Sequence, residues 1–195
     1  MPRGSFRVIK PEIRVIGIDD GVFTPHVPGL VLVVGVVFRG GYWVEGVMHT
    51  EIYVDGFDAT EKIAEMIKAS SHYKQLRVIM LNGVTFGGFN VVDMQKLHAS
   101  TRLPVIAVTR ERPDLQCIHD ALEHMPGSKE RWQMIMDAGE VTEVSTRISS
   151  EKIYLHVVGM SVAEAEAIVR LTSTRSNIPE ALRVAHLVAS GISHV

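Results

Sequence analysis

The uninterrupted apolar run from Leu30 to Phe38 (LVLVVGVVF) constrains the fold more than any other feature of this sequence. The run has the length of a strand and falls well short of the ~20 residues that a membrane-spanning helix needs. Successive side chains of a strand point to opposite faces of its sheet, so a strand that is apolar at every position is typical of a sheet covered on both faces. We therefore expect such a sheet at the centre of this protein.

The order of the remaining patterns predicts how that sheet is built. Three strand patterns, over residues 13–18, 30–38 and 42–54, are joined by turn-type connections and predict an antiparallel meander. Apolar residues then recur with a period of 3.6, which predicts strand–helix–strand units and therefore parallel pairing through right-handed crossovers. These units comprise helices at 59–69 and 91–100 and strands at 75–81 and 104–109. A mixed tail is expected over residues 114–125, 129–138, 140–148, 152–158, 161–175 and 177 onward.

An antiparallel meander followed by crossover-linked parallel strands is the order of a ribonuclease-H-like α/β fold, and the length predicts a single domain, 1–195. In such a sheet the carboxyl ends of the first and fourth strands lie side by side. Asp19 ends the first strand and Asn82 ends the fourth. Ligands of open α/β sheets bind outside the carboxyl ends of the strands. Carboxylates placed there hold Mg²⁺, which supports metal-assisted cleavage of phosphodiester bonds.

Composition limits the kind of partner. The chain carries 22 acidic and 20 basic residues and a net charge of −2, whereas proteins that grip a long phosphate backbone are usually strongly basic. Any contact with nucleic acid must therefore be local. The single cysteine, Cys117, excludes an intramolecular disulfide and is expected to be buried on its helix. The start of the chain lacks the apolar stretch of a signal peptide, so we expect a soluble, cytoplasmic protein.

Several polar residues have two interpretations. Asp58 and Glu61 have the spacing of a capping box at the start of the helix over 59–69. Asp19 and Asn82 each stand next to a residue favoured in turns. Backbone N–H groups of Gly87, Gly88 and Asn90 could bind a phosphate at the start of a helix, or this segment could be no more than a turn.

Three stretches of the sequence resemble a known family. They are Ile13–Gly21 (IRVIGIDDG), Val54–Glu61 (VDGFDATE) and Leu81–Asp93 (LNGVTFGGFNVVD). They are similar to a mostly archaeal family of uncharacterised proteins related to endonuclease V, one branch of which is called endonuclease dU. Later segments, among them residues 178–186, resemble endonuclease V itself. The resemblance implies a nuclease that uses Mg²⁺ or Mn²⁺ and acts on DNA with a deaminated base, uracil or hypoxanthine.

The resemblance also assigns roles to particular residues. Asp19 matches a metal-binding aspartate at the end of the first strand, and Asp58 or Glu61 matches a catalytic glutamate after the third. Endonuclease V has a lysine after its fifth strand, and Arg110 is the basic residue of this sequence nearest to that position. His186 matches a histidine in the last helix of endonuclease V.

One position departs from the pattern, because Asn82 stands where endonuclease V has a second metal-binding aspartate. An asparagine supplies one neutral oxygen, so a site built on it loses a negative charge. Two alternatives to a nuclease therefore stay open. One is a catalytically weak or inactive member that binds nucleic acid or a protein, and the other is an enzyme that hydrolyses small nucleotides.

Overall fold

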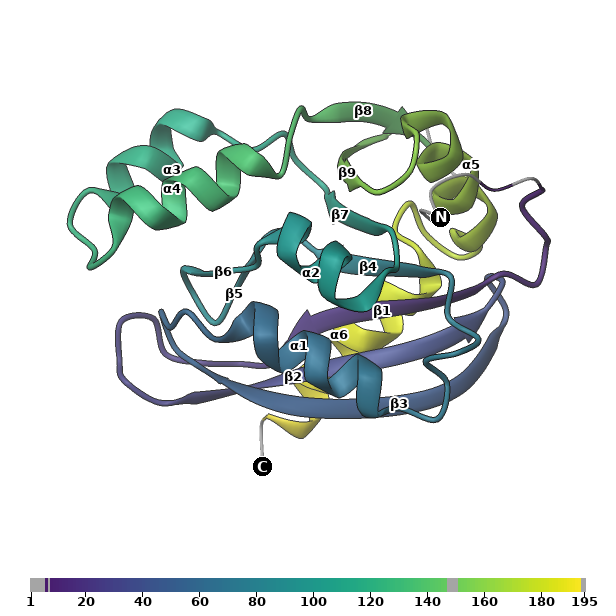
Figure 1. Ribbon diagram of the computed structural model, residues 1–195, viewed down its shortest axis with the longest axis horizontal. Coiled ribbons are helices and arrows are strands. Elements are labelled where there is room, and N and C mark those ends of the chain that lie inside the picture. The colour runs from purple at the N-terminus through teal and green to yellow at the C-terminus, as the bar shows by residue number, and fades with distance from the viewer. Residues whose placement is uncertain (1–5, 7, 147–150, 194–195) are drawn as a thin grey trace.

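The computed structural model describes residues 6, 8–146 and 151–193. Its centre is a seven-stranded sheet in the order β3-β2-β1-β4-β7-β9-β8 (Figure 1). The strands are β1 Arg14–Asp20, β2 Leu30–Arg39, β3 Trp43–Tyr53, β4 Val78–Asn82, β7 Val105–Thr109, β8 Thr142–Ser145 and β9 Lys152–Val158. The first three strands pair antiparallel, β4 and β7 join β1 in parallel, and β9 and β8 complete the sheet antiparallel. This confirms the expected meander followed by parallel strands.

Helices cover both faces of the sheet, as the apolar run in β2 predicts. The helices are α1 Ala59–Ala69, α2 Met94–Thr101, α3 Leu115–Leu122, α4 Ser128–Asp137, α5 Val162–Thr172 and α6 Glu180–Ile192. On one face, α1 and α2 pack against alternate residues of the central strands, such as Ile16 and Ile18. On the other face, α5 and α6 pack against the strand residues that alternate with these, such as Val15. In Figure 1, α6 passes behind β1 and β2, while α1 and α2 lie in front. Among the described residues, no helix is long and apolar enough to cross a membrane.

A glycine in β1 sets how closely α6 approaches the sheet. A Cβ atom at Gly17 would lie 2.2 Å from the carbonyl carbon of Ala181 and 2.5 Å from the backbone nitrogen of Leu182. Only a residue without a side chain allows backbone to pack on backbone at this distance. Gly17 therefore brings the first turn of α6 directly onto β1, two residues before Asp19.

The segment between β4 and α2 differs from its prediction. The helix expected over residues 91–100 begins only at Met94, and the segment before it contains a short hairpin of β5 Thr85–Phe86 and β6 Asn90–Val91. The two strands are too short to show a periodic pattern in the sequence. The hairpin packs against α3 and α4, because Val91 of β6 forms a small hydrophobic cluster with Leu122 of α3 and Ile135 of α4.

One local prediction is wrong and another holds only in part. Cys117 was expected to be buried, but it is exposed and its thiol donates to the Asp114 carboxylate. Asp58 occupies the N-cap position of α1, as the capping-box interpretation predicts, but its side chain makes no cap bond. Its carboxylate instead accepts hydrogen bonds from the backbone N–H of Tyr53 and from the side chain of Asn90. The cap is supplied from β6, where Asn90 Oδ1 accepts from Ala59 N–H at 3.0 Å. A tertiary contact has taken the place of the local one.

Candidate active site at the carboxyl end of the sheet

Asp19 is the centre of a polar cluster drawn from three elements. Its side chain is buried, with 2% of its surface exposed, at the end of β1. Asn82 at the end of β4 donates from Nδ2 to Asp19 Oδ1 at 3.0 Å. His186 on α6 places Nδ1 2.9 Å from Asp19 Oδ2. The fold thus brings together three of the residues that the sequence singled out.

The register of the sheet explains the first of these contacts. Parallel pairing of β1 with β4 places Ile18 beside Leu81, so the next residues, Asp19 and Asn82, leave the sheet as neighbours. Asp19 points toward α6 because side chains alternate along a strand and Val15 and Gly17 face that helix. The close packing of α6 at Gly17 then brings His186 within hydrogen-bonding distance.

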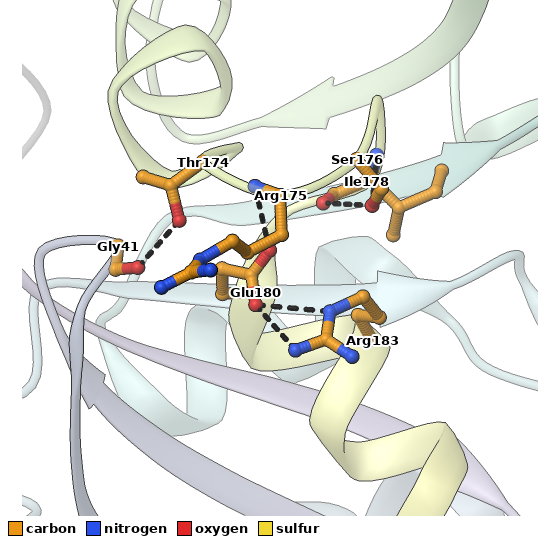
Figure 2. A network of polar contacts seen from close by, with 7 residues as sticks. All are labelled: Gly41, Thr174, Arg175, Ser176, Ile178, Glu180 and Arg183. Carbon is orange, nitrogen blue, oxygen red and sulfur yellow. Dashed lines mark hydrogen bonds and ion pairs between the residues drawn. The ribbon is translucent and has the colours of Figure 1, made fainter. Parts of the chain in front are cut away.

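A second polar network fixes the start of α6. Glu180 is buried and accepts two hydrogen bonds from Arg183, from Nε at 2.9 Å and from Nη2 at 2.7 Å. It also accepts one from Arg175 N–H at 3.0 Å (Figure 2). In the same segment, Thr174 donates to the carbonyl oxygen of Gly41 in the turn between β2 and β3. These bonds hold the first turn of the helix that carries His186.

Asp20 follows Asp19 at the end of β1, and its carboxyl group lies close enough to that of Asp19 to interact with it. Its Oδ2 accepts a hydrogen bond from Gly87 N–H at 2.6 Å. Burial raises the pKa of the Asp20 carboxyl to about 6, and the Asp19 charge adds to the rise, while the Gly87 bond opposes it. Asp20 thus ties β1 to the β5–β6 hairpin and places a second carboxyl group next to Asp19.

The glycine loop of that hairpin is held by carboxylates at two points. Besides the bond from Gly87 to Asp20, Phe89 N–H donates to Asp55 Oδ1 at 2.8 Å. Gly88 lies between them at φ 88°, where a Cβ atom would lie 2.3 Å from the same Asp55 oxygen. Two N–H groups of this loop therefore already bind acidic side chains. A phosphate would have to displace those carboxylates, or bind elsewhere on the loop.

The two candidates for a second carboxylate lie in other networks. Asp58 Oδ1 accepts from Asn90 Nδ2 at 2.7 Å, and within the described residues its buried Oδ2 has no hydrogen-bond partner. Glu61 is exposed on α1 and forms an ion pair with Lys96 of α2, whose hydrogen bond lowers the pKa of Glu61. Asn90 is fully buried and bridges β3, Asp58 and α1.

Arg110 lies at the same end of the sheet as Asp19. It follows β7 directly and is exposed at a cavity of about 500 Å³ that Arg112, Glu151, Tyr154 and Asn177 also line. Asn82 pairs with Val108 in the register of β4 and β7, so Arg110 extends beyond the row that contains Asp19 and Asn82. The cavity therefore opens at the same end of the sheet as the Asp19 cluster, but farther along, between β7 and β9.

Comparison with known proteins identifies the family. Residues 11–193 match the family described as endonuclease dU. The chain belongs to the endonuclease dU family. A "UPF0215 protein" of Methanosarcina acetivorans is 53% identical over 184 residues, which cover 94% of this chain and 92% of that protein. A solved protein of unknown function from Archaeoglobus fulgidus is 38% identical, with a TM-score of 0.84, over 94% of this chain and 99% of the other.

More distant structures share the fold of this endonuclease dU family member. Endonuclease V of Bacillus subtilis has a TM-score of 0.61 at 13% identity and covers 93% of this chain and 81% of its own. Endonuclease V of Ciona intestinalis, solved with DNA containing inosine, has a TM-score of 0.56 at 15% identity, over 89% of this chain and 82% of its own. The ribonuclease-H-like fold expected from the sequence is thereby confirmed.

One buried residue near the site was missed by sequence reasoning. Arg131 of α4 is 2% exposed, and its guanidinium donates to the carbonyl oxygens of Asp55 at 2.6 Å and Gly56 at 2.8 Å, and to that of Phe89. The guanidinium also lies 3.8 Å from the centre of the Phe57 ring. Arg131 thus ties α4 to both the turn after β3 and the glycine loop. Its spacing of four residues from the buried Ile135 was the available signal.

The described residues hold few acidic side chains around Asp19. Across residues 6, 8–146 and 151–193, no three histidine, cysteine, aspartate or glutamate side chains are grouped so that they could hold a metal ion. This differs from the expectation that several carboxylates meet at this end of the sheet. The Asp19 cluster instead offers one carboxylate, one amide and one imidazole.

Proposed function

We propose that this protein is a metal-dependent endonuclease that cleaves DNA near a deaminated base, with uracil as the principal lesion. The main support is the shared contact of Asn82 and His186 with the buried carboxylate of Asp19, at the carboxyl end of a ribonuclease-H-like sheet. Membership of a family described as endonuclease dU supports the reaction class and the lesion. The DNA-bound endonuclease V of Ciona intestinalis, which shares the fold, supports DNA as the partner.

The donor set suits Mg²⁺ or Mn²⁺. Mg²⁺ prefers oxygen ligands and is commonly held by one or two carboxylates, several waters and the phosphates of the substrate. Asp19 would supply the carboxylate, and Asn82 would supply its amide oxygen after rotation of its side chain. When bound there, the ion would lower the pKa of a coordinated water and neutralise charge that develops on the phosphate. Because these residues bring a single negative charge, the phosphate oxygens of DNA would complete the site.

His186 is oriented for proton transfer by its contact with Asp19. Hydrogen bonding of Nδ1 to the carboxylate favours the tautomer with the proton on that nitrogen, and this leaves Nε2 for the substrate. The imidazole is 63% exposed, so an incoming DNA strand can reach it. Nε2 would then accept a proton from the attacking water or, when protonated, donate one to the leaving oxygen.

The contact with DNA is expected to be local. The net charge of −2 argues against a long basic groove, whereas Arg110 and Arg112 follow β7 at the same end of the sheet. These two side chains would bind backbone phosphates beside the Asp19 cluster. A deaminated base must leave the helical stack to be read, which costs a few kcal/mol and least at a mismatch. Asp58, Glu61 and the glycine loop are assigned no direct step here.

A second function is favoured by the same cluster. Asn82 stands where endonuclease V is expected to have an aspartate, and Asp19 contributes the one carboxylate among the three clustered side chains. Such a site binds a divalent ion more weakly than a site with two or three carboxylates. A family member that binds DNA without cleaving it would fit this chemistry.

The test is a nicking assay with labelled oligonucleotides that carry uracil, hypoxanthine or no lesion, in Mg²⁺ or Mn²⁺. The variant Asp19→Asn keeps the size of the side chain and removes its charge. Asp120→Asn makes the same change at an exposed position of α3 and serves as the matched control. Lesion-dependent nicking that is lost in Asp19→Asn and kept in Asp120→Asn supports the proposal. Lesion-dependent binding without nicking in any metal supports the second function.

A further inference from the structure

We propose that the cavity between the end of β7 and the start of β9 receives the extruded base, and that Asn177 distinguishes a deaminated base from its parent. This inference rests on the proposed function and adds the residue that recognises the lesion. The cavity measures about 500 Å³, within the range of small-molecule sites, and it is lined mainly by polar side chains.

The position of the cavity relative to the Asp19 cluster follows from the register of the sheet. Asn82 pairs with Val108 of β7, and the following residue, Thr109, pairs with Tyr154 of β9. Neighbouring strands lie about 4.8 Å apart, so the β7 and β9 sides of the cavity are about 10 and 15 Å from Asp19 along the edge of the sheet. Asn177 also lies three residues before Glu180, in the segment that leads into the helix of His186. One stretch of DNA strand can therefore reach both places.

The lining suits a nucleotide. Arg110 and Arg112 lie at the cavity on the side of β7 and can pair with the phosphates that flank an extruded base. Tyr154 lines the opposite side from β9 and offers a ring on which a base can stack, an interaction that every base can make. Neither feature distinguishes one base from another. Recognition of the lesion therefore requires a hydrogen-bonding group with a fixed direction.

Asn177 is such a group. It is 8% exposed, and its Oδ1 accepts a hydrogen bond from Thr146 Oγ1 at 2.8 Å. Its Nδ2 donates to Glu151 Oε2 at 2.9 Å. An ionised carboxylate can only accept, so the bond to Glu151 fixes which end of the amide is nitrogen. Among residues 6, 8–146 and 151–193 these are the two bonds of the amide, which leaves one N–H and one lone pair for a ligand.

The remaining N–H donor and oxygen acceptor of the Asn177 amide match the hydrogen-bonding edge of a deaminated base. Uracil and hypoxanthine both present a carbonyl oxygen beside a ring N–H, which pair with the amide N–H and the amide oxygen. Cytosine and adenine present an amino group and a bare ring nitrogen at the same places. If cytosine or adenine bound in the same orientation, its amino group would face the amide N–H and its ring nitrogen would face the amide oxygen, so neither hydrogen bond could form. A site that leaves buried polar groups unpaired rejects the wrong ligand strongly.

The same geometry predicts a limit to the discrimination. Thymine has the carbonyl and N–H of uracil and differs by a methyl group, so Asn177 does not separate uracil from thymine. Asn177 is thus expected to set the preference for uracil over cytosine and to leave the ratio between uracil and thymine unchanged. A residue that merely supported the fold would not change one ratio and spare the other.

The experiment compares three single-stranded oligonucleotides that differ only in one uracil, cytosine or thymine. Binding is measured by fluorescence anisotropy without metal, and nicking is measured in Mg²⁺. The wild-type chain should prefer uracil over cytosine by about tenfold or more, since a good bidentate contact is worth ~1–3 kcal/mol. Asn177→Ala should reduce this preference to about twofold and leave the uracil-to-thymine ratio unchanged. Gln116→Ala, which removes an exposed amide on α3, should keep both ratios.

Thermal melting checks that each variant is folded. If Asn177→Ala does not fold, Thr146→Val removes one of the two bonds that fix the amide and should lower the preference for uracil over cytosine. The inference is overturned if a folded Asn177→Ala keeps the wild-type preference, or if it loses affinity for all three oligonucleotides equally. In either case uracil-dependent nicking by the wild-type chain would leave the proposed function standing. A wild-type chain that nicks none of them in Mg²⁺ or Mn²⁺ contradicts the proposed function, and the binding ratios without metal then still decide whether Asn177 recognises the base.

Discussion

His186 Nδ1 lies 2.9 Å from Asp19 Oδ2, although 167 residues separate them in the chain. The contact joins the last helix to the end of the first strand, and Asn82 approaches the other oxygen of the same carboxylate. A buried carboxylate is stable only when donors surround it, so these two side chains also stabilise the charge of Asp19. The arrangement makes the cluster sensitive to changes at each of its three members.

The substitution Asn82→Asp should strengthen metal binding. It adds a second carboxylate beside Asp19, and affinity for divalent ions rises with the charge of the ligands. We expect the dissociation constant for Mn²⁺ to fall about tenfold or more, which corresponds to ~1.4 kcal/mol. Isothermal titration calorimetry measures this directly. Without metal the two carboxylates repel each other, so the variant should melt at a lower temperature than the wild-type chain and gain more from added Mn²⁺. Equal affinity in both chains would show that residue 82 does not contribute to a metal site.

Gly17→Ala should destabilise the protein by forcing α6 away from β1. The new methyl group would lie 2.2 Å from the carbonyl carbon of Ala181. Overpacking of this kind costs about 1–3 kcal/mol in the free energy of unfolding. Urea denaturation measures that cost, and the nicking rate should fall as well, because His186 moves with the helix. The matched change is Gly191→Ala in the same helix, where no atom of the described residues other than its own helix backbone and chain neighbours lies within 4 Å. It should instead stabilise the protein by about 0.5–1 kcal/mol.

Arg131→Met should separate α4 from the site loops. The arginine donates to the carbonyl oxygens of Asp55, Gly56 and Phe89, and methionine would leave these half-buried acceptors without this donor. Each unsatisfied group costs about 1–3 kcal/mol, so we expect a loss of roughly 3 kcal/mol or more in the free energy of unfolding. Hydrogen exchange should also become faster in the β5–β6 hairpin. Lys129→Met, an exposed change on the same helix, provides the comparison. If both variants unfold at the same urea concentration, Arg131 does not have this role.

His156 should make the stability of the protein depend on pH. Burial on β9 lowers its pKa below the ordinary value of 6.5. The unfolded chain therefore binds a proton at a higher pH than the folded chain does, and the free energy of unfolding falls as pH drops below about 6.5. His156→Gln removes the titrating group. The difference in stability between this variant and the wild-type chain, measured in urea at pH 7.5 and pH 5.5, should shift in favour of the variant at the lower pH. A difference that does not change with pH would contradict this origin.

The layout of the sheet could be predicted because it depends on patterns that extend over many residues. The apolar run from Leu30 to Phe38 indicated a sheet covered on both faces, and the change of period after Asp58 indicated where crossovers begin. The neighbouring positions of Asp19 and Asn82 followed from that order. Resemblance to endonuclease V, rather than the pattern alone, pointed to His186.

Other features depend on contacts that no local rule contains. Asp58 has the sequence of a helix cap, but Asn90, 31 residues after Ala59, supplies the bond. Cys117 is exposed and Arg131 is buried, against the usual preference of both residue types. Arg131 is buried because carbonyl oxygens of two distant loops surround it. The two hydrogen bonds that orient the Asn177 amide likewise come from Thr146 and Glu151, which no periodic pattern of the sequence connects with residue 177.

The most direct test of the account is to count Mn²⁺ ions bound per chain by electron paramagnetic resonance, in the presence of a uracil-containing oligonucleotide. The wild-type chain should bind at least one ion that Asp19→Asn loses and Asp120→Asn keeps. Loss of that ion together with uracil-dependent nicking would support Asp19 as the metal ligand of a nuclease. Equal Mn²⁺ binding by Asp19→Asn and the wild-type chain would contradict it.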